Sequence, residues 1–231
     1  MPIIAFEKQS LGASTRSNET IAAVTIAGWT GRDPAAVEKH IRELEELGVK
    51  RPKTVPCYYT VTPDLLTTAN DVAMLGPDSS GEAEVVLYSM NDGLWIGLGS
   101  DHTDRRVEAF SVSVSKQLCA KPVSLTLWRF DDVARHYDQL QLKSFIVEGG
   151  KRVPYQDGLT AAMRPPLELM AGAPGAQNGR LPVGTAMFCG TLAAIGGVRP
   201  ASRFEMELHD PVLKRSLTHA YTVQVVPITG E

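Results

Sequence analysis

The sequence has few cysteines and no long hydrophobic run. Its cysteines, Cys57, Cys119 and Cys189, are odd in number and widely spaced along 231 residues. This pattern does not fit a disulfide framework and is typical of a reducing compartment. The apolar runs are far shorter than the ~20 residues that a membrane-spanning helix requires. No charged stretch followed by a long apolar one opens the sequence, so no signal peptide is expected. We therefore expect a cytoplasmic protein without a membrane partner.

An excess of positive charge is also missing. The chain has 23 Lys and Arg against 26 Asp and Glu, which gives a formal net charge of -3. A surface without a basic excess offers no footprint for a phosphate backbone, so a nucleic-acid partner is not expected. An apolar fraction of 43% with a small net charge excludes a mainly disordered chain. The length allows one large domain, or one with a small appendage.

The first 50 residues predict a small N-terminal α+β segment. Two strands are expected, around Pro2–Phe6 and Ile21–Ala27. Asp33 is a candidate N-cap of a helix over Pro34–Leu47, which Gly48 is placed to end. Prolines follow the helix, so we place a domain boundary near residue 50, with a second domain over 51–231.

The second domain is predicted to be rich in strands and poor in helices. Helices are expected at Asp131–Leu140 and Pro166–Met170, and a surface loop at Ala171–Gly179. The short β-like runs are Glu82–Met90, Leu94–Ser100, Glu108–Ser115, Lys143–Val147, Arg152–Gln156, Thr185–Cys189, Arg203–Leu208 and Leu217–Val226. This pattern favours an α+β, β-rich fold with a folded-over sheet rather than a doubly wound parallel one.

Three acidic residues are expected to converge on one hairpin. Asp92-Gly93 lies between two apolar runs, a strong hairpin pattern. If these two residues form the turn, Glu84 is opposite Asp101, and Glu82 shares their face because strand side chains alternate. Carboxylates this close require solvation, protonation or a cation, and an all-oxygen set suits Mg²⁺, Mn²⁺ or Ca²⁺. The alternative is an exposed acidic edge strand without a metal.

The motifs around this hairpin resemble those of the fumarylacetoacetate hydrolase superfamily. The pair Glu82-x-Glu84 is followed by Ser100-Asp101-His102-Thr103-Asp104-Arg105 and Ser115-Lys116. Downstream motifs in the family's order are Gly149-Gly150-Lys151, Gln156-Asp157-Gly158, Pro166-Leu167-Glu168-Leu169, Leu181-Pro182-x-Gly184-Thr185 and Cys189-Gly190-Thr191. The match covers about residues 80–208 and is most similar to a bacterial branch that shares the Gly-Ser-Asp-His-Thr-Asp-Arg segment.

The resemblance implies a fold, a site and a chemistry. The fold would be a mixed β-sandwich roll like the family's C-terminal domain, in a homodimer. Glu82, Glu84 and Asp101 would be the metal ligands, with Mg²⁺ (or Mn²⁺ or Ca²⁺) as cofactor. Lys116 would hold a substrate oxygen beside the metal, and Arg105 and Thr191 would contact the substrate. The substrate would be a small 2-oxo or 1,3-dioxo carboxylate. The reaction would be C–C bond hydrolysis, decarboxylation or keto–enol isomerisation through a metal-stabilised enolate, in a metal-dependent hydrolase or lyase.

Departures from the family pattern keep a second interpretation open. Ser100 replaces the usual Asn, and Asp104 stands where a small residue is expected. The family's hydrolases activate water with a His before the Glu-x-Glu pair, but the comparable stretch from Tyr58 to Asp64 contains none. The alternative is a metal- and ligand-binding protein of the same fold that catalyses nothing.

Two further patterns are interpreted as structural. Ser113-Val114-Ser115-Lys116 matches the S-x-x-K acyl-enzyme motif, but the alternation around it predicts a strand, which would separate Ser113 from Lys116. His102 neighbours Asp101 and is expected to point away from the carboxylates as a supporting residue, although a role as base stays open.

Overall fold

The computed structural model describes residues 1–46 and 50–230. An eight-stranded mixed sheet forms the centre of the fold. Its strands, in spatial order, are β2 (Ala13–Thr20), β1 (Ile3–Ser10), β12 (Thr126–Arg129), β9 (Gly93–Ser100), β8 (Ala83–Met90), β15 (Thr185–Thr191), β3 (Ala23–Gly28) and β4 (Cys57–Val61). A second sheet packs against it, with the order β14 (Lys151–Leu159), β13 (Gln141–Glu148), β16 (Arg203–Asp210), β17 (Arg215–Val226) and β6 (Asp71–Leu75).

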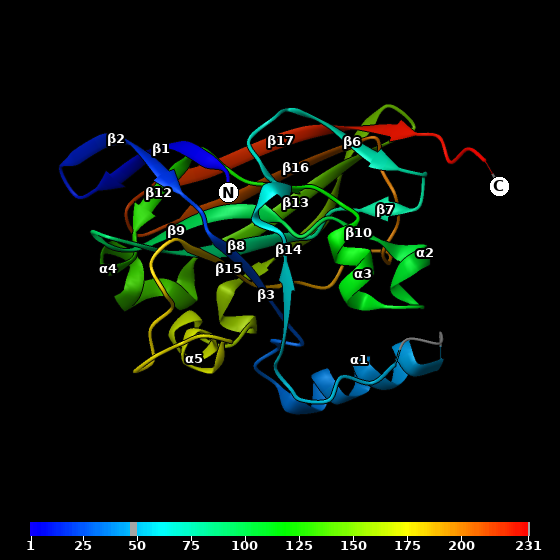
Figure 1. Cartoon of the computed structure of the whole chain (residues 1–231), viewed down its shortest axis with the longest axis horizontal. Coiled ribbons are helices and arrows are strands. Elements are labelled where there is room, and N and C mark those ends of the chain that lie inside the picture. The colour runs from blue at the N-terminus through cyan, green and yellow to red at the C-terminus, as the bar shows by residue number, and fades with distance from the viewer. Residues whose placement is uncertain (47–49, 231) are drawn as a thin grey trace.

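Two short strand pairs and a few short helices complete the chain. The pairs are β7 (Ser79–Ser80) with β10 (Thr103–Asp104), and β5 (Leu66–Thr67) with β11 (Lys121–Pro122). The helices are α1 (Pro34–Glu46), α2 (Arg105–Glu108), α3 (Val112–Gln117), α4 (Phe130–Val133) and α5 (Pro166–Gly172), with 3₁₀ turns η1 (Pro63–Leu65), η2 (Ala134–Gln139) and η3 (Thr160–Ala162). Helix α1 lies at the lower edge of the molecule in Figure 1, apart from the sheets.

The expected helices form, with one split in two. Asp33 caps α1, since its Oδ1 accepts a hydrogen bond from the Ala35 amide at 2.9 Å. The predicted helix end at Leu47 and Gly48 lies outside the described residues. The expected helix over Asp131–Leu140 is divided into α4 and η2, with non-helical angles at His136.

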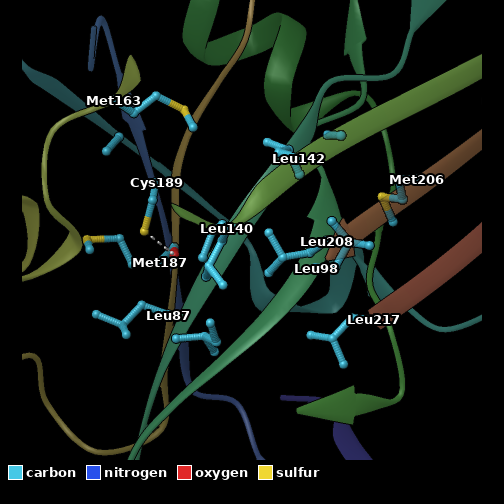
Figure 2. Packing of buried hydrophobic residues seen from close by; sticks show 14 of the residues in the cluster. Leu87, Leu98, Leu140, Leu142, Met163, Met187, Cys189, Met206, Leu208 and Leu217 are labelled. Atoms are coloured by element: carbon cyan, nitrogen blue, oxygen red, sulfur yellow. Dashed lines mark hydrogen bonds between the residues drawn. The ribbon is translucent and has the colours of Figure 1, made fainter. Parts of the chain in front are cut away.

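The space between the two sheets is filled by apolar side chains. Leu87 of β8, Leu98 of β9, Leu142 of β13 and Leu208 of β16 belong to this cluster, and Leu98 lies beside Leu208 (Figure 2). A second apolar cluster covers the other face of the eight-stranded sheet and includes Phe6, Val86 and Tyr88. Each strand of the central hairpin is therefore covered on both faces, which explains why all eight residues of β8 are buried.

Strands from the first 30 residues are part of the large sheet. β1 pairs with β12, and β3 pairs with β15, both in parallel. The proposed boundary near residue 50 stays a prediction. The fold is β-rich with mixed sheets and few helices, as the sequence predicts.

Candidate metal centre

The β8–β9 hairpin carries the three carboxylates, with a register different from the expected one. Met90 pairs with Gly93, so the chain turns at Asn91 and Asp92. Gly93 has the positive φ of this loop, 126°, and lies after the turn rather than inside it. The predicted pairing of Glu84 with Asp101 is therefore wrong by two positions.

The shift of two positions preserves the shared face. Glu84 pairs with Gly99, and the Asp101 amide donates to the carbonyl of Glu82 at 2.9 Å. Because side chains alternate with period two, all three carboxylates still point to one side. Each offers an oxygen, and these oxygens lie within 4.8 Å of one another. Glu84 and Asp101 are buried, whereas Glu82 is partly exposed.

Three cations surround this carboxylate triad. Lys116 of α3 donates to Asp101 Oδ2. Lys121 of β11 lies 3.2 Å from Asp101 Oδ1. Arg105 of α2 brings its Nη2 to 3.0 Å from Glu82 Oε1, and it also donates from Nε to the hydroxyl of Ser80 at 2.7 Å.

The carboxyls differ in their partners and therefore in their acidity. Burial, Asp101 and Glu82 together raise the pKa of Glu84 well above its usual range. Its Oε2 accepts the Gly190 amide at 2.7 Å. Burial would also raise the pKa of Asp101, but Lys116 and Lys121 outweigh it and lower the value. Glu84 is thus the member of the triad that lacks a close cationic partner among the described residues.

Lys116 keeps its charge in this buried position. Burial opposes the ammonium form, but the nearby carboxylates of Asp101 and Glu82 outweigh it and raise the pKa. Its Nζ also lies 5.6 Å from the centre of the Tyr59 ring. A permanently charged donor therefore borders the triad.

The segment that carries Lys116 is helical, so the predicted strand Glu108–Ser115 is wrong. Asp104 caps α2 by accepting the Val107 amide at 2.9 Å, and Ser111 caps α3 by accepting the Val114 amide at 3.4 Å. These local bonds favour helix starts over an extended chain.

The helix places Ser113 and Lys116 one turn apart, so the geometric reason for setting the S-x-x-K motif aside does not hold. Ser113 is nevertheless exposed, whereas Lys116 is buried and donates to Asp101. Lys116 therefore interacts with the triad and not with Ser113.

Thr191 lies at the end of β15 beside the triad, with its hydroxyl in use. Its Oγ1 donates to the carbonyl of Ala83 at 2.8 Å and accepts from Gln156 Nε2 at 2.6 Å. Gln156 Oε1 in turn accepts the Ala83 amide at 2.9 Å. These bonds hold the strand next to Glu84. Contact between Thr191 and a substrate stays a prediction.

His102 is turned away from the carboxylates. Its ring nitrogens lie 2.8 Å from the Tyr221 hydroxyl and 2.9 Å from the Ser79 hydroxyl. The alternation of a strand indicated this orientation. A role for His102 as base at the triad has no support in this geometry.

Sequence reasoning missed two neighbours of the site, Lys121 and Tyr59. Lys121 is separated from every quoted motif, and its position depends on the pairing of β11 with β5. Tyr59 belongs to the stretch from Tyr58 to Asp64, which contains no histidine. Trp29 donates from Nε1 to its hydroxyl at 3.4 Å, and Trp29 has a positive φ of 59°, which is rare for a bulky residue.

The residues present fit a hard divalent cation. All three donors are carboxylate oxygens, which Mg²⁺, Mn²⁺ and Ca²⁺ prefer. Asp101 Oδ1 is buried and accepts no aligned hydrogen bond within the described structure. Lys121 Nζ lies 3.2 Å away without hydrogen-bond alignment, so coordination of a cation would satisfy this buried oxygen.

Comparison with known proteins places the chain in a family. The family model described as "Protein of unknown function (DUF2848)" matches residues 27–221. The chain belongs to the DUF2848 family. No curated protein matches this member of the family.

Solved structures give this DUF2848 member its fold relatives. A 2-keto-3-deoxyarabinonate dehydratase matches with a TM-score of 0.65 and 16% identity, over 90% of this chain and 75% of that one. The same kind of dehydratase, complexed with magnesium and 2,5-dioxopentanoate, matches with a TM-score of 0.64 and 16% identity, over 90% and 74%. The protein Cg1458 matches with a TM-score of 0.60 and 13% identity, over 93% and 80%.

The expected fold class is confirmed: the chain shares the fumarylacetoacetate hydrolase-like fold of these dehydratases. Among its described helices, none has the length and apolarity to cross a membrane.

Proposed function

We propose that this protein is a divalent-metal-dependent enzyme that acts on a small 2-oxo or 1,3-dioxo carboxylate. The convergence of Glu82, Glu84 and Asp101 within 4.8 Å carries the proposal. Such a triad beside permanent cations suits an anionic, chelating ligand better than a neutral one.

Each residue of the site has a proposed role. The three carboxylates would hold Mg²⁺ (or Mn²⁺ or Ca²⁺), which supplies Lewis-acid polarisation of a carbonyl group. Lys116 would hold the substrate oxygen on which negative charge develops, since its ammonium is fixed and charged before the reaction starts. Arg105 is the proposed contact for the substrate carboxylate; its Nη2 now lies 3.0 Å from Glu82 Oε1. Thr191 is a proposed substrate contact.

The proposed chemistry proceeds through an enolate. C–C bond hydrolysis, decarboxylation, keto–enol isomerisation and loss of water next to a carbonyl all develop negative charge on the same oxygen. The fold relative complexed with magnesium and 2,5-dioxopentanoate is a dehydratase, which supports a lyase as much as a hydrolase. Fold alone does not choose among these reactions. A homodimer is proposed from the family resemblance.

A second candidate function is binding without catalysis. The observation that favours it is that no histidine side chain described by the structure faces the triad: His102 is bonded to Tyr221 and Ser79, and Tyr59 borders Lys116. Such a protein would retain the metal and the anionic ligand but convert nothing.

The metal site is tested by titration of the protein with Mn²⁺ and Mg²⁺ in a calorimeter. We expect saturable binding by the wild type and a loss of at least about 100-fold in affinity for Glu84→Gln, because one of three ligand carboxylates is removed. Glu205→Gln is the matched control, since Glu205 pairs with Arg152 and Arg203 away from the triad. No binding by the wild type at millimolar metal would contradict the proposal.

A turnover assay distinguishes the proposed enzyme from the non-catalytic binding protein. The metal-loaded protein is mixed with acylpyruvates, oxaloacetate and 3-deoxy-2-oxo sugar acids, and the products are followed by enol absorbance and mass spectrometry. Turnover that Lys116→Met abolishes supports the enzyme. Saturable binding of these acids without any product supports the non-catalytic alternative.

A further inference from the structure

Lys121 is a fully buried lysine that no motif of the site includes. Its side chain has no exposed surface. It belongs to β11, which is held in place by parallel pairing with β5. Burying an ammonium is costly unless its donors are used, so this position calls for a specific set of acceptors.

The acceptors of Lys121 belong to the two segments that carry the site. Its Nζ donates to the carbonyl of His102 at 2.6 Å and to the carbonyl of Lys116 at 2.5 Å. It also lies 3.2 Å from Asp101 Oδ1, but without hydrogen-bond alignment. One ammonium therefore joins the residue after Asp101 to the main chain of Lys116.

We propose that Lys121 is a positioning residue that fixes Asp101 and Lys116 relative to each other for metal binding. A lysine that served only to neutralise Asp101 would direct an N–H at the carboxylate. Here the aligned bonds go to the main-chain carbonyls of His102 and Lys116, in addition to the ion pair with Asp101 Oδ1 at 3.2 Å. The proposal rests on the proposed function, since it concerns the same metal site.

Positioning and plain charge predict opposite changes in metal affinity. If Lys121 holds the carboxylate in place, its loss weakens metal binding, as losses of supporting bonds around metal ligands do by about 10–100-fold. If Lys121 acts only as a nearby positive charge, its loss removes repulsion and strengthens metal binding.

The test is calorimetric titration with Mn²⁺ of the full chain and of Lys121→Met, which removes both hydrogen bonds. We expect the Mn²⁺ affinity to fall by at least about 10-fold. Lys121→Gln restores an amide donor without charge, so we expect an affinity between those of the wild type and Lys121→Met. An affinity that is unchanged or higher in both variants would overturn the proposal.

Lys8→Met is the matched control. Lys8 is also buried, with ion pairs to Glu19 at 2.8 Å and Asp92 at 2.7 Å, far from the triad. We expect Lys8→Met to lower the melting temperature while leaving Mn²⁺ affinity unchanged.

An equal loss of Mn²⁺ affinity in Lys8→Met would show general destabilisation and overturn the positioning role of Lys121. If Lys121→Met does not fold, Lys121→Gln decides alone, with a fall in affinity supporting the role. Absence of Mn²⁺ binding by the wild type would instead overturn the proposed function, and the positioning role with it.

Discussion

Gly190 controls how closely the end of β15 approaches Glu84. Its amide donates to Glu84 Oε2, its φ is +95°, and a Cβ there would lie 1.7 Å from Thr30 Oγ1. Gly190→Ala should therefore move the amide away from Glu84, and we expect a loss of stability of more than about 2 kcal/mol with weaker Mn²⁺ binding. Gly12→Ala is the control, because Gly12 also has a positive φ, of 82°, but nothing lies within 4 Å of its Cβ position. Urea denaturation and calorimetry measure both effects, and equal results for the two variants would refute this account.

Asp210 is expected to make stability depend on pH. Its Oδ1 accepts the amides of Val212 and Leu213 and lies 3.0 Å from His136 Nε2. Burial would raise the pKa of Asp210, but these partners outweigh it and lower the pKa below the ordinary 3.8. Because the pKa of Asp210 is lower in the folded state than in the unfolded state, ionised Asp210 stabilises the fold above about pH 4. This stabilisation is lost as the pH falls further.

Asp210→Asn should remove this dependence. At pH 6 we expect the variant to be less stable by about 2 kcal/mol, because a buried charged acceptor is replaced by a neutral one. The difference should shrink as the pH falls from 4 to 3. Urea midpoints at each pH measure the difference, and a gap that stays constant over this range would show that Asp210 is not responsible.

At the scale of elements, capping decides the conformation of the segment that carries Arg105 and Lys116. Asp104 caps α2, which explains why a carboxylate stands there. Asp104→Ala should lower stability by about 1 kcal/mol, since the Val107 amide loses its acceptor. Asp104→Asn keeps an acceptor oxygen, so its free energy of unfolding should fall by at most a few tenths of a kcal/mol. Chemical denaturation compares the variants, and a larger loss for Asn than for Ala would contradict the capping role.

The sequence correctly predicts that the three carboxylates share a face. Side chains alternate along a strand, so a shift of two residues in the pairing register leaves each side chain on the same face. Glu82, Glu84 and Asp101 stay together whichever residue takes the turn. The register depends on which residue of the loop has the positive φ. The sequence around Asp92-Gly93 is compatible with a turn at Asp92 and Gly93 or with one at Asn91 and Asp92. Sequence alone does not resolve that choice.

The alternation of apolar and polar residues led to the wrong prediction of a strand at Glu108–Ser115, where the apolar residues face solvent. Phe110 and Val114 alternate with serines as in a strand, but the structure exposes them, at 80% and 43%. The caps at Asp104 and Ser111 act over three residues and outweigh that pattern. Lys121 and Tyr59 reach the site through pairings between distant segments, β11 with β5 and β4 with β3. No local pattern contains that information.

At the scale of the whole molecule, the central hairpin links the metal site to both apolar clusters. Val85 and Leu87 point between the two sheets, whereas Val86 and Tyr88 enter the cluster that includes Phe6 of β1. The carboxylates share the second face. The N-terminal strands therefore support the same hairpin that carries the triad, and we expect them to unfold with it.

This expectation tests the proposed boundary near residue 50. Phe6 is fully buried, and its ring centre lies 5.2 Å from that of Tyr88. Phe6→Ala should destabilise the chain by about 3–5 kcal/mol through the cavity that it leaves. If the chain unfolds as one unit, calorimetry will show a single transition at a lower temperature, with equal calorimetric and van't Hoff enthalpies. Leu11→Ala, at a side chain 65% exposed on the same β1–β2 hairpin, should leave that transition unchanged. Two separate transitions, with only the first shifted by Phe6→Ala, would show instead that residues 1–50 form a unit of their own.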